Sequence, residues 1–384
     1  METRKLYYED CHLSRFTARV LYCQQTDKGF DIILDATAFY PEGGGQDADT
    51  GTLGSVRVLH TREEGETVIH LCDAPLEVGS TVEGILDYGN RFRLMQQHTG
   101  EHIVSGIIHG KYGYPNVGFH MSTDVITIDF DGVIPAEDLP AIESEANQAV
   151  WQNLPVKCFV PGPEELKQTF YRTKKDLPWP VRIVQVPEFD SCACCGVHVA
   201  RTGEIGLIKL YSTVGLRGGT RMEMACGAQA LDTLNRAWEQ NKQVSQAFSA
   251  QITETGEAAR RMNETVAGLK YRITGLERKI FALTAEGYAG KGDVLHFAED
   301  LDPAAVRDLA DAIAENCGGS AAVFSGADGE GDSICRVTPQ GDLRQLGREM
   351  TKALNGRGGG KPIFQQGKVM ATKTEIVRFF AEVR

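Results

Sequence analysis

The chain has 384 residues, of which 42% are hydrophobic and 24% are charged. This composition excludes a disordered or fibrous protein, and the length favours two or three domains over one. No segment approaches a membrane span, and the charged N-terminus lacks the apolar stretch of a signal peptide, so we expect a cytoplasmic protein without membrane contact. Ten cysteines are too few for a disulfide scaffold.

The net charge of −12 argues against a nucleic acid partner, because phosphate binding normally leaves a basic footprint. The charge is unevenly distributed, however. Residues 344–384 hold nine Lys or Arg against three Asp or Glu, which is a local balance of +6. The C-terminal region therefore predicts a mildly basic surface on an acidic protein, and a solvated face is the simpler interpretation of it.

The fold predicted from the hydrophobic pattern is α+β. Residues 1–90 read as short β-segments between Gly, Pro and Asp turns, which indicates a small β-rich subdomain. Residues 91–226 then predict a second domain that contains one extended sheet. Its expected elements are helices over 91–111 and 136–153 and strands over 125–130, 156–160 and 181–186.

Apolar residues follow a heptad-like register from Leu231 to Leu283, with separations that alternate between three and four. Such a register is typical of a coiled coil or a helical hairpin over 227–289, and Gly256 makes a bend near 253–257 plausible. Two interpretations stay open here, which are an intramolecular hairpin and a homodimer interface through 231–283.

Residues 290–384 return to an α/β pattern and predict a separate small C-terminal domain. We expect strands over 321–324 and 334–337 and helices over 303–316 and 343–354. A glycine-rich stretch follows at 355–362 and includes Arg357 and Lys361. Its backbone can approach a phosphate or simply turn tightly, and as a motif it is weak.

Two short motifs carry the residue types of a zinc site. His98 and His102 are four residues apart on the predicted helix, so both imidazoles project from one face. Cys194 and His198 show the same separation in a glycine-containing segment. Three imidazoles and one thiolate form a plausible zinc ligand set, and we predict one Zn²⁺ per chain.

Alternatives to this ligand set remain at the sequence level. Cys195 stands beside Cys194 and is an alternative thiolate ligand. Four protein ligands usually describe a structural zinc, whereas a catalytic zinc keeps one position open, and the spacing does not choose between them. Without a metal, the cysteines would be small buried hydrophobes and His198 a core histidine.

Four stretches resemble the editing domain of alanyl-tRNA synthetases and the free-standing alanyl-tRNA editing proteins, in their long form. They are the glycine-rich motif at 34–46 (LDATAFYPEGGGQ), the first metal motif at 95–102 (MQQHTGEH), the second metal motif at 194–206 and the segment at 219–223 (GTRME). The family's second motif usually reads CGGTH, so Cys195 and Val197 depart from it. The glycine-rich tail at 356–361 is similar to the C-terminal domain of alanyl-tRNA synthetases.

The resemblance implies an aminoacyl-tRNA deacylase that acts in trans on tRNA(Ala) mischarged with serine, and also with glycine. Nothing before the glycine-rich motif is long enough for an aminoacylation domain. A pocket built for alanine cannot strongly exclude a residue that only adds a hydroxyl, which is the physical reason for such an enzyme.

Several residues receive roles from this resemblance. Thr37 is expected near the serine hydroxyl, Gln46 near the ester or its water, and Glu101 as a base. Thr37 and Gln46 can equally be turn residues. Zinc would either activate a water or hold the amino group of the substrate. Contacts with tRNA are expected from Gly43, Gly44, Gly45, Arg221, Arg357 and Lys361.

Two other functions compete with editing. The sequence from His98 to His102 also satisfies the inverted zinc peptidase pattern His-x-x-Glu-His, which needs a distant carboxylate ligand and leaves Cys194 and His198 unused. A non-catalytic tRNA-binding protein with a structural zinc would bind tRNA without turnover.

Overall fold

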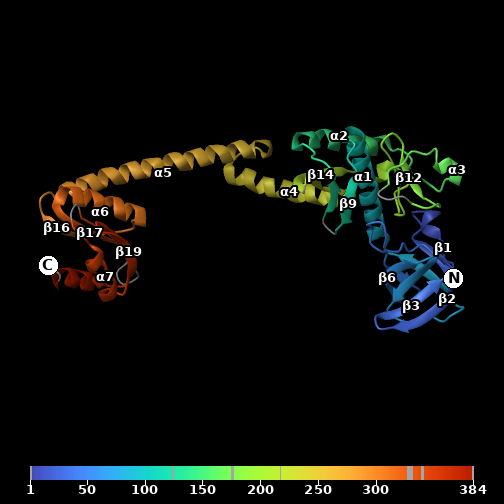
Figure 1. Cartoon of the computed structure of the whole chain (residues 1–384), viewed down its shortest axis with the longest axis horizontal. Helices are drawn as coiled ribbons and strands as arrows, with labels where there is room; N and C mark the ends of the chain where they lie inside the picture. Colours follow the sequence, from blue (N-terminus) through green and yellow to red (C-terminus); the bar gives the residue numbers. More distant parts are fainter. Residues whose placement is uncertain are drawn as a thin grey trace. The chain divides into compact units, whose positions relative to one another are not determined.

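The computed structural model describes residues 2–122, 125–173, 177–216, 218–326, 332–338 and 341–382. Contacts divide the chain into two compact units, Met1–Lys242 and Gln243–Arg384, and each is described by itself. Both contain helices and strands (Figure 1), so the α+β class is confirmed. Among the described helices, none combines the length and apolar character needed to cross a bilayer.

The first unit begins with a closed six-stranded barrel, drawn in blue in Figure 1. Its strands alternate buried and exposed residues, as in β2, so that one face of each strand fills the barrel. The core includes Phe16, Ile32 and Leu34. In barrel order, the strands are β2 (Arg15–Thr26), β3 (Gly29–Leu34), β7 (Thr67–Cys72), β6 (Val56–Glu64), β5 (Gly51–Leu53) and β8 (Thr81–Leu86).

Two short elements flank the barrel. Strand β1 (Arg4–Lys5) pairs in parallel with β4 (Ala36–Thr37), which leads into the glycine-rich motif. The 3-10 turn η1 (Leu6–Tyr8) follows β1 and places the Tyr8 hydroxyl against the carbonyl oxygen of Cys195 at 2.7 Å. The N-terminal segment therefore links the glycine-rich motif to the second metal motif.

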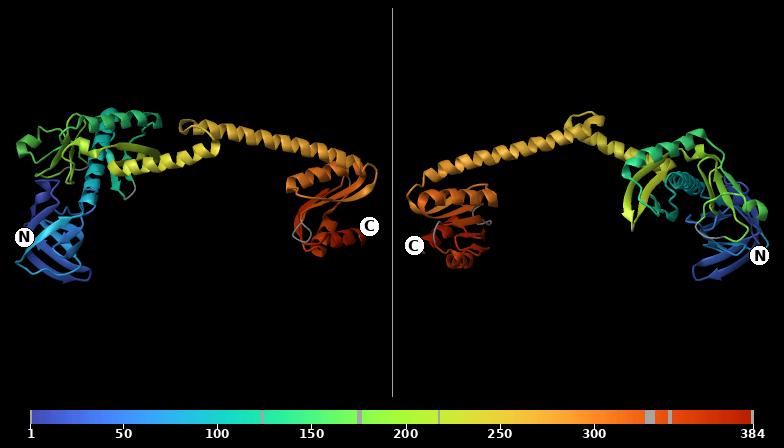
Figure 2. Two further views of the ribbon diagram at one scale, coloured as in Figure 1. Left: turned by 180° about the vertical axis from the view of Figure 1, so that it is seen from behind. Right: turned by 45° about the horizontal axis from the view of Figure 1, so that its top comes forward.

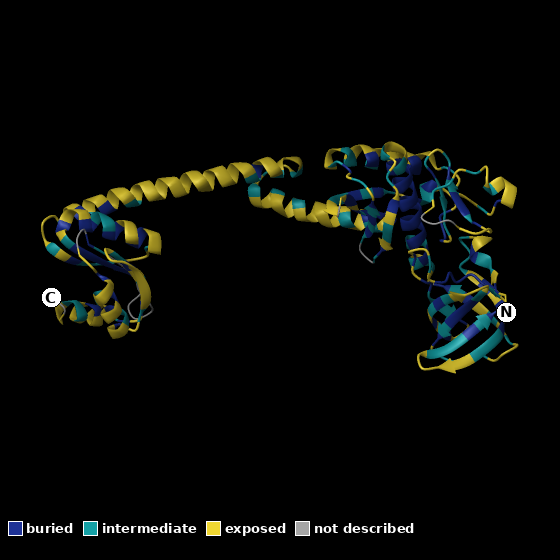
Figure 3. Cartoon of the chain, in the orientation of Figure 1, coloured by how far each residue is buried: buried dark blue, intermediate teal, exposed yellow. Residues whose placement is uncertain are grey.

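Helix α1 (Tyr88–Tyr112) is the central element of the first unit. Asp87 caps its start by accepting from the amide of Asn90, and Gly113 ends it with a φ of 75°. The helix is buried along most of its length (Figure 3). A Cβ at Gly106 would lie 2.2 Å from the carbonyl oxygen of Phe189, so only glycine lets that segment approach so closely.

Two sheets surround α1, where the sequence predicted one extended sheet. The prediction was wrong because an alternating pattern identifies a strand but not its neighbours. The four-stranded sheet has the order β14 (Ile208–Leu216), β15 (Gly219–Cys226), β10 (Ile126–Phe130) and β9 (Asn116–Met121). The three-stranded sheet has the order β11 (Lys157–Phe159), β12 (Ile183–Val186) and β13 (Asp190–Ala193).

Short helices complete this unit. Helix α2 (Leu139–Gln152) packs against α1 and β14, and buries Ile142, Ala146 and Val150. The remaining elements are the 3-10 turns η2 (Ala136–Asp138) and η3 (Thr202–Ile205) and the single turn α3 (Pro163–Leu166).

Two long helices occupy the region of the heptad-like register. They are α4 (Gly227–Phe248) and α5 (Thr255–Glu286), with the 3-10 turn η4 (Ile252–Glu254) between them. The break therefore comes slightly earlier in the chain than the predicted bend. Along α5 the apolar positions are exposed in Figure 3, among them Leu269 (53%), Ile273 (54%) and Ile280 (59%).

The second unit, whose C-terminal part is drawn in orange and red in Figure 2, contains a five-stranded sheet. Strand β19 forms one edge of this sheet. Helix α6 (Pro303–Cys317) packs on β17 and buries Leu309 and Ile313. All five residues of β19 are exposed. Because β19 contains most of the glycine-rich stretch and lies at the edge of the sheet, this stretch is an edge strand and not a tight turn. In sheet order, the strands are β16 (Gly292–Ala298), β17 (Gly318–Ser325), β18 (Asp332–Val337), β20 (Phe364–Val369) and β19 (Arg357–Lys361). The other helices are α7 (Arg344–Ala353) and α8 (Lys373–Glu382).

Candidate metal centre

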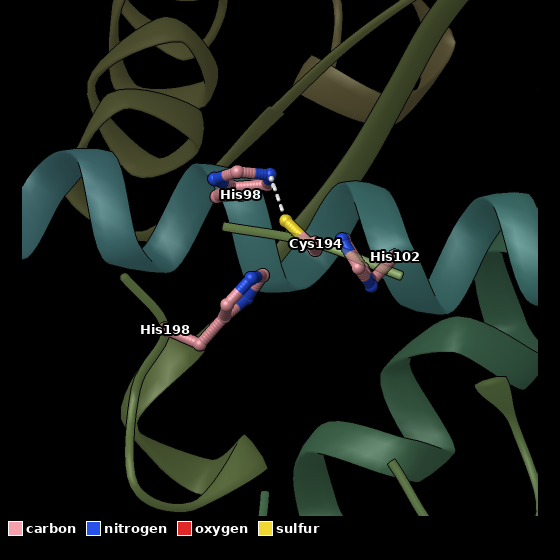
Figure 4. Close-up of side chains that lie close together, drawn as sticks. All are labelled: His98, His102, Cys194 and His198. Atoms are coloured by element: carbon pink, nitrogen blue, oxygen red, sulfur yellow. Dashed lines mark hydrogen bonds between the residues drawn. The ribbon is translucent and has the colours of Figure 1, made fainter. Parts of the chain in front are cut away.

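The four predicted metal ligands lie together in the first unit. His98 and His102 project from successive turns of α1, and Cys194 and His198 come from the loop after β13 (Figure 4). Their donor atoms all lie within 4.8 Å of one another. His98 Nε2 is 3.4 Å from Cys194 Sγ, close to the separation of roughly 3.6 Å between two ligands of a tetrahedral zinc.

The chemistry of this cluster fits a zinc ion. Burial raises the pKa of Cys194, but His98, His102 and His198 outweigh it and hold that pKa well below the ordinary value. The thiolate also accepts from the amide of Gly196 at 3.3 Å. His198 Nε2 is buried and has no hydrogen-bond partner within the described part of the chain. A thiolate beside an unpartnered imidazole nitrogen is the donor combination that zinc binds.

A different polar group lies beside the Nδ1 atom of each histidine. His98 Nδ1 is 2.9 Å from Gln46 Oε1, and His198 Nδ1 is 3.2 Å from Thr99 Oγ1. His102 Nδ1 lies 3.0 Å from Asp190 Oδ2. When Nδ1 carries the proton, each Nε2 is left as a free donor for a metal.

Burial lowers the pKa of His102, but Asp190 and Cys194 outweigh it and hold that pKa well above its ordinary value. For His198, burial and the imidazoles of His98 and His102 hold the pKa well below the ordinary range. These opposite shifts arise inside one cluster because only His102 has a carboxylate neighbour. A bound metal would displace a proton from His102.

Glycines let the loops approach the cluster closely. A Cβ at Gly196 would lie 2.1 Å from His98 Cε1, and one at Gly45 would lie 2.6 Å from the Phe119 ring. The two departures from the family motif leave these contacts intact. Cys195 is exposed, and buried Val197 donates its amide to Gln46 Oε1 at 3.2 Å.

A cavity of about 580 Å³ opens beside the ligands. Glu101 lies in its wall and accepts from Asn116 Nδ2 at 2.6 Å and from the hydroxyl of Ser105. Asn116 Oδ1 has no hydrogen-bond partner among the residues that the structure describes, although Asn116 is only 6% exposed. The other residues that line the cavity are Gly44, Gly45, His98, His102, Phe119, Arg172, Thr173, Leu177, Pro178, Pro180, Val181, Arg182, Ala193, Cys194 and Cys195.

Thr37 does not line this cavity, contrary to its predicted role near the substrate. The side chain is fully buried, and its hydroxyl lies 2.8 Å from His70 Nε2. It also accepts from the amide of Phe39 at 3.1 Å. These contacts favour the alternative interpretation of Thr37 as a structural residue beside the barrel, and its role near the substrate stays a prediction.

Gln46 contacts a metal ligand, where the resemblance placed it near the ester. Its Oε1 atom accepts from His98 and from the amide of Val197, and Gln46 does not line the cavity. Gly43 closes a turn with Gln46 through two backbone hydrogen bonds, whereas Gly44 and Gly45 line the cavity. The glycine-rich motif therefore supports His98 and forms part of the cavity wall.

The three cationic residues among the predicted tRNA contacts are divided between the two units. Arg221 on β15 forms a two-point ion pair with Asp129 on β10, with both distances at 2.7 Å. Arg357 and Lys361 begin and end the exposed strand β19 in the second unit. Arg221 is thus in the same unit as the metal centre without lining the cavity, whereas Arg357 and Lys361 belong to the unit that is described by itself.

Sequence analysis missed four residues around the centre. Thr99 lies between the two helical histidines in the first metal motif, so the motif itself could have indicated this residue. Asn116, Arg172 and Asp190 follow no ligand spacing, and only the fold brings them together. Asp190 and Cys192 also form a second group of donor atoms with His102.

Three family models match successive parts of the chain. Residues 3–89 match the class II (A) tRNA synthetases, and residues 181–223 match the second additional domain of threonyl and alanyl tRNA synthetases. Residues 291–383 match the DHHA1 domain. The second match contains Cys194 and His198.

Individual proteins align with almost the whole chain. Alanyl-tRNA editing protein Aarsd1-B of Xenopus laevis is 26% identical over 96% of this chain and 94% of its own length. An alanine–tRNA ligase of Thermofilum pendens is 32% identical over 97% of this chain, which spans only 43% of that protein. The C-Ala domain of Aquifex aeolicus alanyl-tRNA synthetase is 24% identical, with a TM-score of 0.21, and covers 23% of this chain and 88% of that domain.

The resemblance predicted from the four motifs is therefore confirmed, and over nearly its whole length the chain is a relative of the alanyl-tRNA editing proteins.

Proposed function

We propose that this protein is an aminoacyl-tRNA deacylase that hydrolyses mischarged tRNA(Ala) in trans, with Ser-tRNA(Ala) as its main substrate and Gly-tRNA(Ala) as a second. The observation that carries the proposal is the cluster of His98, His102, Cys194 and His198 at the wall of a cavity. The names of its relatives, alanyl-tRNA editing proteins, supply the substrate class.

The four ligands would hold one zinc ion through three imidazole nitrogens and one thiolate. Zinc supplies a Lewis acid at this position, which polarises an oxygen or holds an amino group. Glu101 lies in the same wall, and its carboxylate is the group that we assign to accept a proton from the attacking water. Ser105 and Asn116 hold that carboxylate in place.

We assign recognition of the serine hydroxyl to Asn116. Its Oδ1 atom is a buried acceptor without a partner in a residue that lines the cavity, so a hydroxyl donor from the substrate would satisfy it. Alanine has no hydroxyl and would leave Oδ1 unpaired. A site of this kind discriminates by hydrogen bonding, which a purely apolar alanine pocket does not do.

We propose that the second unit contributes affinity for tRNA. Arg357 and Lys361 flank three glycines on an exposed edge strand, where backbone amides and two cations are accessible to phosphates. The acidic charge of the whole chain makes such a local basic surface necessary. Gly43, Gly44, Gly45 and Arg221 are the remaining candidates for substrate contacts, and Gly44 and Gly45 already line the cavity.

We propose that a second copy of the chain covers the exposed apolar positions of α5. Met262, Val266, Leu269, Ile273 and Leu276 follow the heptad spacing and are between 41% and 54% exposed. A continuous apolar seam of this kind is typical of a helix that packs against a partner helix. Sedimentation of the full chain tests the homodimer, and a monomer at micromolar concentration would contradict it.

The deciding experiment is incubation of the protein with Ser-tRNA(Ala), Gly-tRNA(Ala) and Ala-tRNA(Ala), with and without a chelator. We expect hydrolysis of the first two, little loss of Ala-tRNA(Ala), and loss of activity on chelation that zinc restores. Binding of tRNA without turnover in the zinc-loaded protein would favour a structural zinc and reject the proposal.

A zinc peptidase is a poorer match to the geometry. That function would use the two histidines and Glu101 and leave the loop residues aside. Cys194 and His198 instead lie in the same donor cluster as both helical histidines. Cleavage of a peptide library by the zinc-loaded protein would reverse this choice.

A further inference from the structure

The three histidines of the cluster differ in the groups that hold them. His98 is held by an amide oxygen and His198 by a hydroxyl, both of which are neutral. His102 is held by the carboxylate of Asp190, with 3.0 Å between Nδ1 and Oδ2. Of the three histidines, His102 is therefore the one whose Nδ1 neighbour carries a full charge.

Asp190 is buried deeply for an acidic residue, with 1% of its side chain exposed. Burying a carboxylate is costly unless charges and hydrogen bonds compensate it. Here, Oδ1 accepts from Arg172 Nε at 2.7 Å, while Oδ2 faces His102. Arg172 lines the cavity, so a chain of three side chains leads from the cavity wall to a metal ligand.

The backbone is built to allow this contact. Asp190 begins β13, and β13 packs against α1 where Gly106 follows His102 by one turn. A Cβ at position 106 would lie 2.8 Å from the Cβ of Asp190 and 2.2 Å from the carbonyl oxygen of Phe189. The absence of a side chain at Gly106 is therefore what brings the carboxylate within reach of the imidazole.

We propose that Asp190 is a positioning residue for the metal centre. Its carboxylate fixes the ring of His102 through Nδ1 and leaves Nε2 to bind the metal. Arg172 holds the Asp190 carboxylate in that orientation. The inference rests on the proposed zinc binding. It extends that proposal by naming the two residues, Asp190 and Arg172, that set the affinity of His102 for the metal. With an imidazole on one oxygen and a guanidinium on the other, the carboxylate supports His102 and does not form a second metal site with Cys192.

The proposal predicts a graded effect on metal affinity. Partners that hydrogen-bond a ligating histidine typically contribute 10- to 100-fold to metal affinity. In Asp190→Asn the amide oxygen can still accept from His102, but the negative charge is lost and the amide nitrogen does not accept from Arg172. We therefore expect the zinc Kd to rise about 10-fold in Asp190→Asn and about 100-fold in Asp190→Ala.

The measurement uses the full chain, stripped of metal and titrated with zinc against a chromophoric competitor. A second titration with Co²⁺ reports ligand geometry through its absorption bands, which a loss of general stability would not move. We expect weaker or shifted bands in Asp190→Asn. Asp129→Asn is the matched control, because Asp129 also pairs with an arginine in the first unit but does not belong to either group of potential metal donors.

Arg172→Gln is the second variant and keeps the Asp190 carboxylate. We expect a smaller rise in the zinc Kd, and Arg172→Lys should restore part of the affinity because it restores the cation. A folded Asp190→Asn protein with the zinc Kd and cobalt spectrum of the parent would overturn the proposal. If Asp190→Asn does not fold, unchanged affinity in Arg172→Gln overturns it. Failure of the parent chain to bind zinc would reject the proposed metal centre itself, and the inference with it.

Discussion

The guanidinium of Arg91 on α1 and the carboxylate of Asp49 form a fully buried ion pair, with Nε 2.9 Å from Oδ2 and 3.0 Å from Oδ1. Asp49 follows the glycine-rich motif by three residues, and it also accepts from the amide of Tyr40 at 2.6 Å. The pair therefore joins the motif to the helix that carries His98 and His102.

Arg91→Met should destabilise the first unit by roughly 3–5 kcal/mol, because it leaves the buried Asp49 carboxylate without its cation. Urea denaturation followed by circular dichroism measures this loss. The double variant Arg91→Met with Asp49→Asn should recover part of the stability. Equal stability of the single and double variants would show that the charge of Asp49 is compensated elsewhere.

Gly196→Ala should weaken zinc binding, because the added methyl group would lie 2.1 Å from His98 Cε1 and displace a ligand. We expect at least about a 10-fold rise in the zinc Kd, comparable to loss of an outer partner. Gly110→Ala is the matched control on the helix that carries His98, since nothing lies within 4 Å of a Cβ there. Parental zinc affinity in Gly196→Ala would show that the loop can shift without cost.

Asn116→Ala should lower kcat/KM for Ser-tRNA(Ala) by about 10-fold, the effect of one hydrogen bond of roughly 1 kcal/mol or slightly more. It should lower the slow hydrolysis of Ala-tRNA(Ala) by less, since alanine makes no such bond and loses only the support that Asn116 gives to Glu101. Deacylation of both substrates under single-turnover conditions measures the ratio. An equal loss for both would assign Asn116 to the support of Glu101 and not to the hydroxyl.

Thr37→Val tests whether Thr37 has a structural role or the predicted role near the substrate. The variant should keep the ratio of serine to alanine hydrolysis and lose about 1–3 kcal/mol of stability, because His70 Nε2 is left without its partner. A changed substrate ratio with unchanged stability would restore Thr37 to the substrate site.

His70 should make the stability of the first unit depend on pH. Burial lowers the pKa of His70 to about 4, from an ordinary value of 6.5. Between these values the unfolded chain binds a proton that the folded chain does not, so the unfolding free energy falls as the pH drops from 6.5 to 4. The loss approaches about 3 kcal/mol, and above pH 6.5 the group contributes no slope.

Denaturation of the parent and of His70→Gln at several pH values isolates this contribution. The difference between the two proteins should shrink or invert as the pH falls, because glutamine does not titrate. Parallel pH profiles would show that folding leaves the pKa of His70 unchanged.

Local patterns were enough to predict the metal ligands, because each pair occupies one short segment. Helical spacing puts His98 and His102 on one face, and the glycine between Cys194 and His198 allows a tight loop. The joining of the two pairs depends on β13 packing against α1, which no spacing rule describes. Asp190 and Asn116 escaped prediction for the same reason.

Thr37 shows a limit of prediction from a motif. It lies in the glycine-rich stretch, yet it sits in β4, where successive side chains point to opposite sides. The sequence places Thr37 near the motif but does not show which side it faces. Pairing of β4 with β1 and the contact with His70 decide that question.

The placement of the ligands has a consequence for the durability of the first unit. His102 and Cys194 are separated by a long stretch of chain that includes α2, β10 and the whole three-stranded sheet. A metal held by both would act as a cross-link that closes this stretch into a loop, and closing a long loop restricts the unfolded chain most. Metal content would then set how long the catalytic unit survives heat or proteolysis, while the unit that begins at Gln243 would be unaffected.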